Sequence, residues 1–269
     1  MSNVTLNCRQ QALAEALYQA YRNNFYGLEN KPLNMAEWEG VVTDDDTAYA
    51  VQDAVMAKKL GPVAGYKVSL TSKQTQDMFD SDCPLYGAQV AERFVPAPAT
   101  LELAHLNEPL LECELCFTAK RDLDASMTAE ELLANCTVAA DMEVPDSRFA
   151  NWFPTLSKYL VMSDCAVGGY VVYGTPVDGS ELTVEGMGGY TGRCYHDGEL
   201  VKQGATSEIL GNPVNSLQWL VGKLASQGKS FDRGMHASVG TVFVPPTLTA
   251  GTWRVEFDGP FGSVELTVK

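Results

Sequence analysis

Hydrophobic residues follow two different periodicities in the two parts of the chain. Over residues 7 to 29 they recur every three or four positions, which predicts an amphipathic helix with the stripe Leu13, Ala16, Leu17, Ala20 and Tyr21. A second helical stripe runs from about residue 43 to residue 60, with Thr43 and Asp44 as its cap and Gly61 as its stop. Residues 30–40, with Pro32 and Asn34, are predicted to connect the two helices.

From residue 62 onward the pattern changes to short apolar runs separated by turns. Most of these runs predict strands, at residues 65–72, 109–117, 136–144, 238–244, 253–257 and 263–268, with a hairpin at 182–195 and 200 onward. Short helices are expected at residues 72–78, 128–134 and 214–227, and a turn at 82–87, whereas residues 157–161 fit a helix end or a strand. The sequence therefore predicts an α+β fold. We expect one domain over residues 1–269, helical in 1–61 and β-rich in 62–269; the alternative is two domains that meet near residue 62.

The amino-acid composition indicates the size of the core, the kinds of partner and the cellular compartment to expect. The chain has 269 residues, of which 45% are hydrophobic, enough for a large core. Its 34 acidic and 19 basic residues give a net charge of −15, which argues against nucleic acid and anionic membranes as partners. The start has no signal-peptide pattern and no apolar run would span a bilayer. The seven cysteines, an odd number, are typical of reduced thiols, so we expect a cytoplasmic protein.

The most informative stretch is residues 109–117, which carries Glu112 and Glu114 two positions apart. On a strand these two carboxylates point to the same face, while Cys113, Leu115 and Phe117 point to the other. Adjacent acids among apolar neighbours repel each other and resist desolvation, and a divalent cation relieves both problems.

A third acid, Glu143, ends the apolar run at residues 136–144. Three carboxylates completed by water suit a hard cation such as Mg²⁺ or Mn²⁺. The alternative is that all three are ordinary surface acids. Other chemistries lack support, because the three histidines are far apart and the sequence has no G-x-S-x-G, P-loop or G-x-G-x-x-G motif.

Five motifs in order give the chain a resemblance to a known family. They are Gly65-Tyr-Lys-Val-Ser-Leu-Thr-Ser-Lys73, Asp82-Cys-Pro-Leu-Tyr-Gly87, Glu112-Cys-Glu114, Glu143-Val-Pro-Asp-Ser-Arg148 and Leu210-Gly-Asn-Pro-Val-Asn215. In this order they resemble the 2-oxopent-4-enoate hydratase and 4-oxalocrotonate decarboxylase family of the fumarylacetoacetate hydrolase superfamily. The resemblance implies N-terminal helices followed by a highly twisted β-roll, usually in homo-oligomers.

The resemblance also implies a site and a chemistry. Glu112, Glu114 and Glu143 match the family's ligands for Mg²⁺ or Mn²⁺, and the substrates would be short 2-oxo acids or their dienols. Hydration, decarboxylation and tautomerisation share one enolate, so these motifs do not choose among them. A hydratase is our first expectation and a decarboxylase the second. The family's hydratases and decarboxylases associate, so a partner enzyme of the same pathway is also expected.

Further site residues follow from the same resemblance. Lys67 matches the family's pocket lysine, although its place in the sequence also fits a surface lysine at a strand end. Thr71 and Ser72 would contact the substrate carboxylate, a role compatible with capping a helix. Asp82 is assigned to catalysis, and Leu85, Asp164 and Val167 to the lining of the substrate site.

The chain departs from the family pattern around that pocket. Leu85 replaces the acid to which proton transfer is generally assigned, and a leucine cannot transfer protons. Cys165 and Val167 replace an asparagine and a serine, and Leu110 stands where a basic residue is common. Two hypotheses follow: an enzyme for a more apolar substrate or a reaction with fewer proton transfers, or a non-catalytic ligand-binding or partner subunit.

Overall fold

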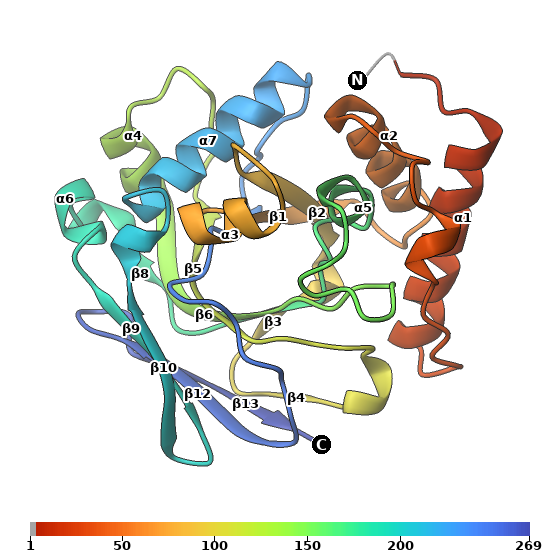
Figure 1. The fold of residues 1–269 in the computed structure, drawn as a ribbon. Coiled ribbons are helices and arrows are strands. Elements are labelled where there is room, and N and C mark those ends of the chain that lie inside the picture. Colours follow the sequence, from red (N-terminus) through yellow and green to blue (C-terminus); the bar gives the residue numbers. More distant parts are fainter. Residues whose placement is uncertain (1–3) are drawn as a thin grey trace.

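The computed structural model describes residues 4–269, so the first three residues of the predicted helical part lie outside it. Two helices, α1 (Cys8–Phe25) and α2 (Asp45–Met56), pack against each other at one side of the molecule (Figure 1). The Asn7 side chain caps α1 by accepting hydrogen bonds from the backbone N–H groups of Arg9 and Gln10. The Asp44 side chain caps α2 by accepting a hydrogen bond from the backbone N–H of Thr47.

Both helices end earlier than the periodicity predicts. Helix α1 stops at Phe25 rather than near residue 29, because Gly27 takes a left-handed φ of 59°. Helix α2 stops at Met56 rather than Leu60. After it, the backbone N–H groups of Lys58 and Lys59 bond three residues back, which tightens the last turn.

The larger of two β-sheets has eight strands among residues 4–269. Seven follow the order β2-β1-β11-β5-β6-β7-β3, and β8 pairs with β6. Their bounds are β1 (Val63–Ser69), β2 (Leu85–Val90), β3 (Phe94–Pro96), β5 (Glu112–Ala119), β6 (Cys136–Val144), β7 (Tyr170–Tyr173), β8 (Val177–Asp178) and β11 (His236–Ser238). Because β11 inserts between β1 and β5, segments more than 100 residues apart lie side by side.

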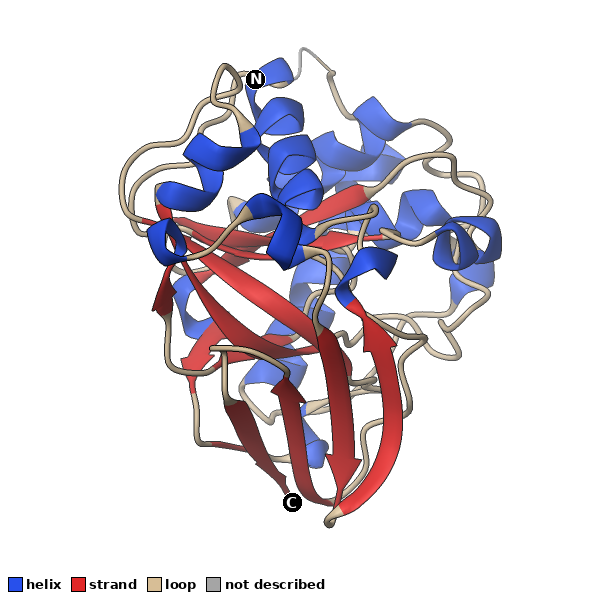
Figure 2. Cartoon of the chain, turned by 90° about the vertical axis from the view of Figure 1, so that its left-hand side faces the viewer, coloured by secondary structure: helices blue, strands red, loops and turns tan. Residues whose placement is uncertain are grey.

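The smaller sheet lies below the larger one in Figure 1, and Figure 2 shows its strands strongly twisted. Its order is β10 (Glu199–Ala205), β9 (Thr191–His196), β12 (Gly251–Phe257), β13 (Ser263–Val268) and β4 (Ala99–Leu101). The sheets approach closely at Gly192, where a Cβ would come within 2.9 Å of the Cys113 sulfur. A buried core fills the space between them, and it includes Cys113, Leu115 and Phe117 as predicted.

Short helices cover the larger sheet. They are α3 (Lys73–Met78), α4 (Ala129–Ala134), α5 (Lys158–Ser163), α6 (Val184–Met187) and α7 (Pro213–Ser226), with 3₁₀ turns η1 (Met35–Glu37), η2 (Ala91–Arg93), η3 (Leu103–His105), η4 (Gly179–Glu181) and η5 (Thr206–Glu208). Helix α7 packs on α4, and α5 packs on α2. No helix within the described residues is long and apolar enough to cross a bilayer. The predicted α+β class, with N-terminal helices before a twisted β-roll, is confirmed.

Some of the helices, strands and turns predicted from the sequence are confirmed by the structure, and others are wrong. The strand at residues 136–144 and the helices after Ser72, Thr128 and Asn212 are confirmed. The strand predicted from residue 182 is wrong at its start, because Thr183 caps helix α6 and β9 begins only at Thr191. The strand predicted at 238–244 is mostly wrong, because strand β11 covers His236–Ser238 and ends where the prediction begins. The turn predicted at 82–87 is wrong in its second half, because strand β2 begins at Leu85. Residues 157–161 belong to helix α5, which Ser157 caps.

Candidate metal centre and active site

The register between β5 and β6 builds a cluster of four carboxylates. Glu112 lies opposite Glu143, and Glu114 lies opposite Asp141. Residues paired across strands share a face, and so do residues two apart on one strand. All four carboxylates therefore point to one side of the sheet, and three of them are buried: Glu114, Asp141 and Glu143. The alternative that the three predicted ligands are surface acids is wrong.

Lys67 on β1 adds a cation to this cluster. Its ammonium forms an ion pair with the carboxylate of Glu143 and lies 3.8 Å from Oε2 of Glu112. The Lys67 side chain is only 2% exposed, so the interpretation as a surface lysine is wrong. Strand β11 pairs with β1 on one side and with β5 on the other, and this order places Lys67 close to the glutamates.

Strand β11 and the residues after it orient the remaining acids. The Ser238 hydroxyl lies 2.6 Å from Oε2 of Glu114 and 2.8 Å from Oδ2 of Asp141. The backbone N–H of Gly240 donates to Oε2 of Glu114 over 2.7 Å. Gly240 has a φ of 120°, and a Cβ there would lie 2.2 Å from the Thr71 hydroxyl oxygen. Thr71 is buried next to Gly240, and its predicted contact with a substrate carboxylate stays a prediction.

Asp141 and Ser238 were not recognised in the sequence. A signal existed for the aspartate, because Asp141-Met-Glu143 repeats the alternation of Glu112-Cys-Glu114 on the partner strand. No signal pointed to Ser238, whose position depends on the insertion of β11 between β1 and β5.

The buried acids hold their protons more tightly than exposed ones. Burial, followed by repulsion from Glu112, raises the pKa of Glu114 well above its ordinary value. Burial likewise raises the pKa of Glu143 despite the opposing Lys67, and raises that of Asp141 to about 8. Burial disfavours the charged form of Lys67, but attraction to Glu143 and Glu112 outweighs it and raises the lysine pKa.

The donor set fits a hard divalent cation. Glu112, Glu114 and Glu143 each offer an oxygen, and these atoms lie within 4.8 Å of one another. Oε1 of Glu143 and Oδ1 of Asp141 are buried and have no hydrogen-bond partner. Unpartnered buried oxygens cost free energy, and a cation satisfies them directly. Oxygen-only ligands favour Mg²⁺ or Mn²⁺ over softer metals.

A small cavity opens beside the cluster. The cavity has a free volume of about 40 Å³, and Lys67 and Glu112 form part of its wall. Most other lining side chains are apolar: Leu70, Phe79, Leu110, Trp152, Phe153, Val161 and Val167. The placement of Val167 in this wall agrees with its predicted position in the substrate site.

Two residues of this wall have unusual backbone conformations. Leu70 has a φ of 58°, and Val167 ends a run from Cys165 in which three consecutive residues have φ between 50° and 53°. A left-handed conformation is an outlier for a β-branched residue. Such strain persists where the surroundings over-determine it, commonly at functional sites. Both strained residues here line the cavity beside the carboxylates.

Five residues predicted for catalysis or substrate binding do not line this wall, and two of them are Thr71 and Ser72. The other three lie elsewhere. Asp82 is exposed. Leu85 is buried in β2 opposite Ser69. Asp164 is buried and binds Arg148, accepting hydrogen bonds from its backbone N–H and from the Ser147 hydroxyl. No residue of this set lines the cavity in the described part of the chain, and their predicted roles stay predictions.

Ser72 has a structural task. Its hydroxyl accepts a hydrogen bond from the backbone N–H of Thr75 and caps α3. Among the histidines, His236 bonds the Thr118 hydroxyl and stacks against the rings of Phe94 and Tyr173. Its role here is structural. All seven cysteines are free, and Cys113 and Cys116 lie in different apolar clusters, as expected for opposite faces.

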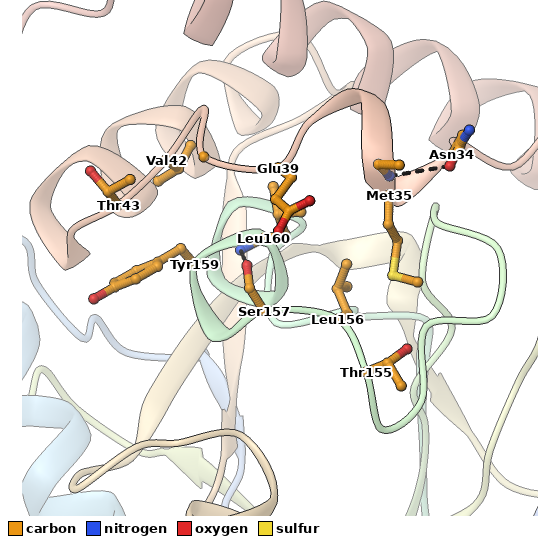
Figure 3. Close-up of a pocket in the computed structure, with 12 residues that line it drawn as sticks. Asn34, Met35, Glu39, Val42, Thr43, Thr155, Leu156, Ser157, Tyr159 and Leu160 are labelled. Atoms are coloured by element: carbon orange, nitrogen blue, oxygen red, sulfur yellow. Dashed lines mark hydrogen bonds between the residues drawn. The ribbon is translucent and has the colours of Figure 1, made fainter.

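A larger groove, of about 610 Å³, lies elsewhere on the surface. It runs between the segment at residues 34–43 and the segment at residues 155–160 (Figure 3). Glu39 is the one charged residue in its lining among the described residues, and none of the four clustered carboxylates reaches it. Of the four clustered carboxylates, Glu112 lines the small cavity and none lines this larger groove.

Comparison with known proteins agrees with this geometry. No family model matches the chain. It is 30% identical over 234 residues to the 2-keto-4-pentenoate hydratase of Burkholderia vietnamiensis, covering 83% of this chain and 86% of that protein. It is 29% identical over 271 residues to the 2-keto-4-pentenoate hydratase of Paraburkholderia xenovorans, covering 93% and 95%.

The chain belongs to the 2-keto-4-pentenoate hydratase and 4-oxalocrotonate decarboxylase family. Its fold agrees with that of the 4-oxalocrotonate decarboxylase of Pseudomonas putida G7, solved with magnesium and adipate, at a TM-score of 0.87. That comparison covers 99% of this chain and 100% of the other at 23% identity, which shows the fold alone. The resemblance found in the motifs is confirmed, as is the fumarylacetoacetate hydrolase type of fold.

This member of the hydratase and decarboxylase family replaces polar groups by apolar ones near the cavity. Val167 and Leu110 both line it, so these two departures from the family pattern remove polarity from the wall itself. Cys165 is buried and faces Lys59, whose ammonium donates to its sulfur over 3.8 Å. The departure at Leu85 lies on the neighbouring strand β2, opposite Ser69 of the cavity wall.

Proposed function

We propose that this protein is a metal-dependent lyase that acts on a short 2-oxo acid or its dienol, as a hydratase of the 2-oxopent-4-enoate type. The observation that carries the proposal is the largely buried cluster of Glu112, Glu114, Glu143 and Lys67 beside a small cavity. The similarity to curated hydratases over most of the chain supports it.

The three glutamates would hold Mg²⁺ or Mn²⁺. When bound there, the ion supplies Lewis acidity to the 2-oxo group of a substrate. The chain itself supplies the framework, because the β5–β6 register fixes Glu112 against Glu143 and Ser238 fixes Glu114. A centre built on strands in this way needs little reorganisation when a ligand arrives.

Lys67 is the proposed catalytic cation beside the substrate carboxylate or enolate, because the acids around it raise its pKa and keep it charged. It lines the cavity, and Leu85 cannot replace the usual acid. We assign Thr71, packed on Gly240, to the substrate carboxylate, with Ser72 beside it at the start of α3. Asp82 remains a proposed second acid, although it is exposed and does not line the cavity. Asp164 remains a proposed residue of the substrate site, although it pairs with Arg148 and does not line the cavity.

Two alternatives rest on Leu85. Without an acid at this position, a reaction that needs fewer proton transfers, decarboxylation, becomes a candidate. Loss of catalysis with retention of ligand or partner binding is the other. Product analysis separates these outcomes, because hydration consumes the dienol without CO₂, decarboxylation releases CO₂, and a non-catalytic protein does neither. The homo-oligomer and the partner enzyme expected from the family stay predictions.

The experiment compares Glu114→Gln with Glu130→Gln, an exposed glutamate in the first turn of α4. Each pure protein is incubated with Mg²⁺ and 2-hydroxypenta-2,4-dienoate, and dienol absorbance and products are followed. We expect metal-dependent hydration by the wild type and by Glu130→Gln, and its loss in Glu114→Gln. Unchanged activity in Glu114→Gln would refute the proposed metal site.

A further inference from the structure

The active-site cavity is lined by four polar residues, Lys67, Ser69, Thr75 and Glu112, and otherwise by apolar residues. Lys67 and Glu112 are the charged ones, and they lie at the carboxylate cluster. The apolar side chains come from several elements and are chiefly those of Leu70, Phe79, Leu110, Phe153, Val161 and Val167. Thr75 donates its hydroxyl to the carbonyl of Ser72. The carboxylate cluster would take the 2-oxo acid head, so the apolar side chains would face the tail.

Among the described residues, no free cation lines the cavity to pair with a charged tail. Lys67 is the one cation in the wall, and it is already engaged with Glu143 and Glu112. The buried guanidinium of Arg148 does not line the cavity. Its nitrogen atoms donate to the carboxylate and backbone carbonyl of Asp164 and to the carbonyl of Gly168.

We infer that the site selects 2-oxo acids with an uncharged, apolar tail and rejects those with a second carboxylate at the far end. This inference rests on the proposed function, because it assumes that the 2-oxo acid head binds at the carboxylate cluster. Burying a carboxylate without a partner is strongly unfavourable, whereas burying an apolar tail is favourable. The neighbouring glutamates add repulsion to that cost.

A pair of aromatic rings stands in one part of the cavity wall. The rings of Phe79 and Phe153 lie 6.2 Å apart, and both line the cavity. Phe79 also lines an outer depression, in which Lys158 is the one basic residue among those described. Lys158 does not line the cavity, so it gives a distal carboxylate no partner within the wall.

The test compares two ligands of equal chain length that differ in the terminal group. These are 2-oxohexanoate and 2-oxohexanedioate, which lack the double bond that hydration needs. Binding of each to the wild-type protein in saturating Mg²⁺ is measured by calorimetry. We expect the monoacid to bind about tenfold or more tightly than the diacid. Equal binding, or preference for the diacid, would overturn the inference and leave the proposed function intact.

A pair of variants at Phe79 tests whether charge is the cause. Phe79 is partly exposed, so Phe79→Arg can add a cation to the wall, and Phe79→Gln adds polarity without charge. We expect Phe79→Arg to reduce the preference for the monoacid by about threefold or more, and Phe79→Gln to leave it closer to wild type. The same preference in both variants would refute charge as its basis. Binding of neither acid to the wild type would refute the proposed function as well.

Discussion

Lys67 balances much of the negative charge at the centre. Its ammonium lies between Glu143 and Glu112 and is almost fully buried. The surrounding acids keep it charged, since their attraction outweighs the effect of burial on its pKa. Its spacing in the sequence allowed either a surface or a pocket position, and only the pairing of β1 with β11 decides between them. Lys67 therefore has two roles: its ion pairs stabilise the buried glutamates of the sheet, and its side chain lines the cavity.

Replacing Lys67 by methionine should lower the stability of the metal-free protein. The buried Glu143 would lose its cation, and removing one partner of a buried ion pair costs about 3–5 kcal/mol. We expect Lys67→Met to unfold at a lower temperature than the wild type without metal, and to gain more stability from added Mg²⁺. Differential scanning calorimetry with and without Mg²⁺ measures both. An unchanged melting temperature in the metal-free variant would contradict this description of the cluster.

At the scale of elements, the site depends on strand register. The alternation at residues 112–114 and the run at 136–144 were enough to predict two strands and the shared face of Glu112 and Glu114. Local pattern could not reveal that Glu112 faces Glu143 or that β11 would insert beside β5, because both are long-range pairings. The errors at residues 182–195 and 238–244 have a similar origin. A capping threonine begins α6, and the partners of β11 end with Ser238.

Strand β11 should matter for metal affinity through Ser238. Its hydroxyl contacts both Glu114 and Asp141, and loss of such an orienting group typically weakens metal binding about 10–100-fold. We expect Ser238→Ala to bind Mn²⁺ at least about tenfold more weakly than the wild type, as measured by titration calorimetry. Ser216→Ala is the matched control, because the Ser216 hydroxyl is buried on α7 and has no hydrogen-bond partner. Equal losses in both variants would contradict a specific role of β11.

The molecule as a whole is acidic but buries several of its cations. Of the 19 basic residues, four are buried: Lys59, Lys67, Arg93 and Arg148. Lys67 and Arg148 have carboxylate partners, and Arg93 lies over three aromatic rings. Among the described residues, no carboxylate forms an ion pair with Lys59, whose ammonium lies 4.1 Å from the centre of the Tyr21 ring. Composition gives the net charge, but only the fold shows which charges are buried.

Lys59 should make stability depend on pH. Burial lowers its pKa from 10.5 to about 8, so between these values the unfolded chain binds more protons than the folded one. The free energy of unfolding then rises with pH across this window, and below about pH 8 the cost of burying the charge is constant. We expect Lys59→Met to be more stable than the wild type by about 3 kcal/mol at neutral pH, with a smaller gain above pH 9. Urea unfolding at both pH values measures this, and parallel pH profiles would contradict it.

Metal-dependent turnover tests the central claim most directly. The pure protein would be treated with EDTA, dialysed, and assayed on 2-hydroxypenta-2,4-dienoate before and after Mg²⁺ or Mn²⁺ is restored. Our account predicts no hydration by the metal-free protein, recovery with either ion, and no CO₂ release. Hydration that persists without metal, or its absence after metal has been shown to bind, would contradict the account.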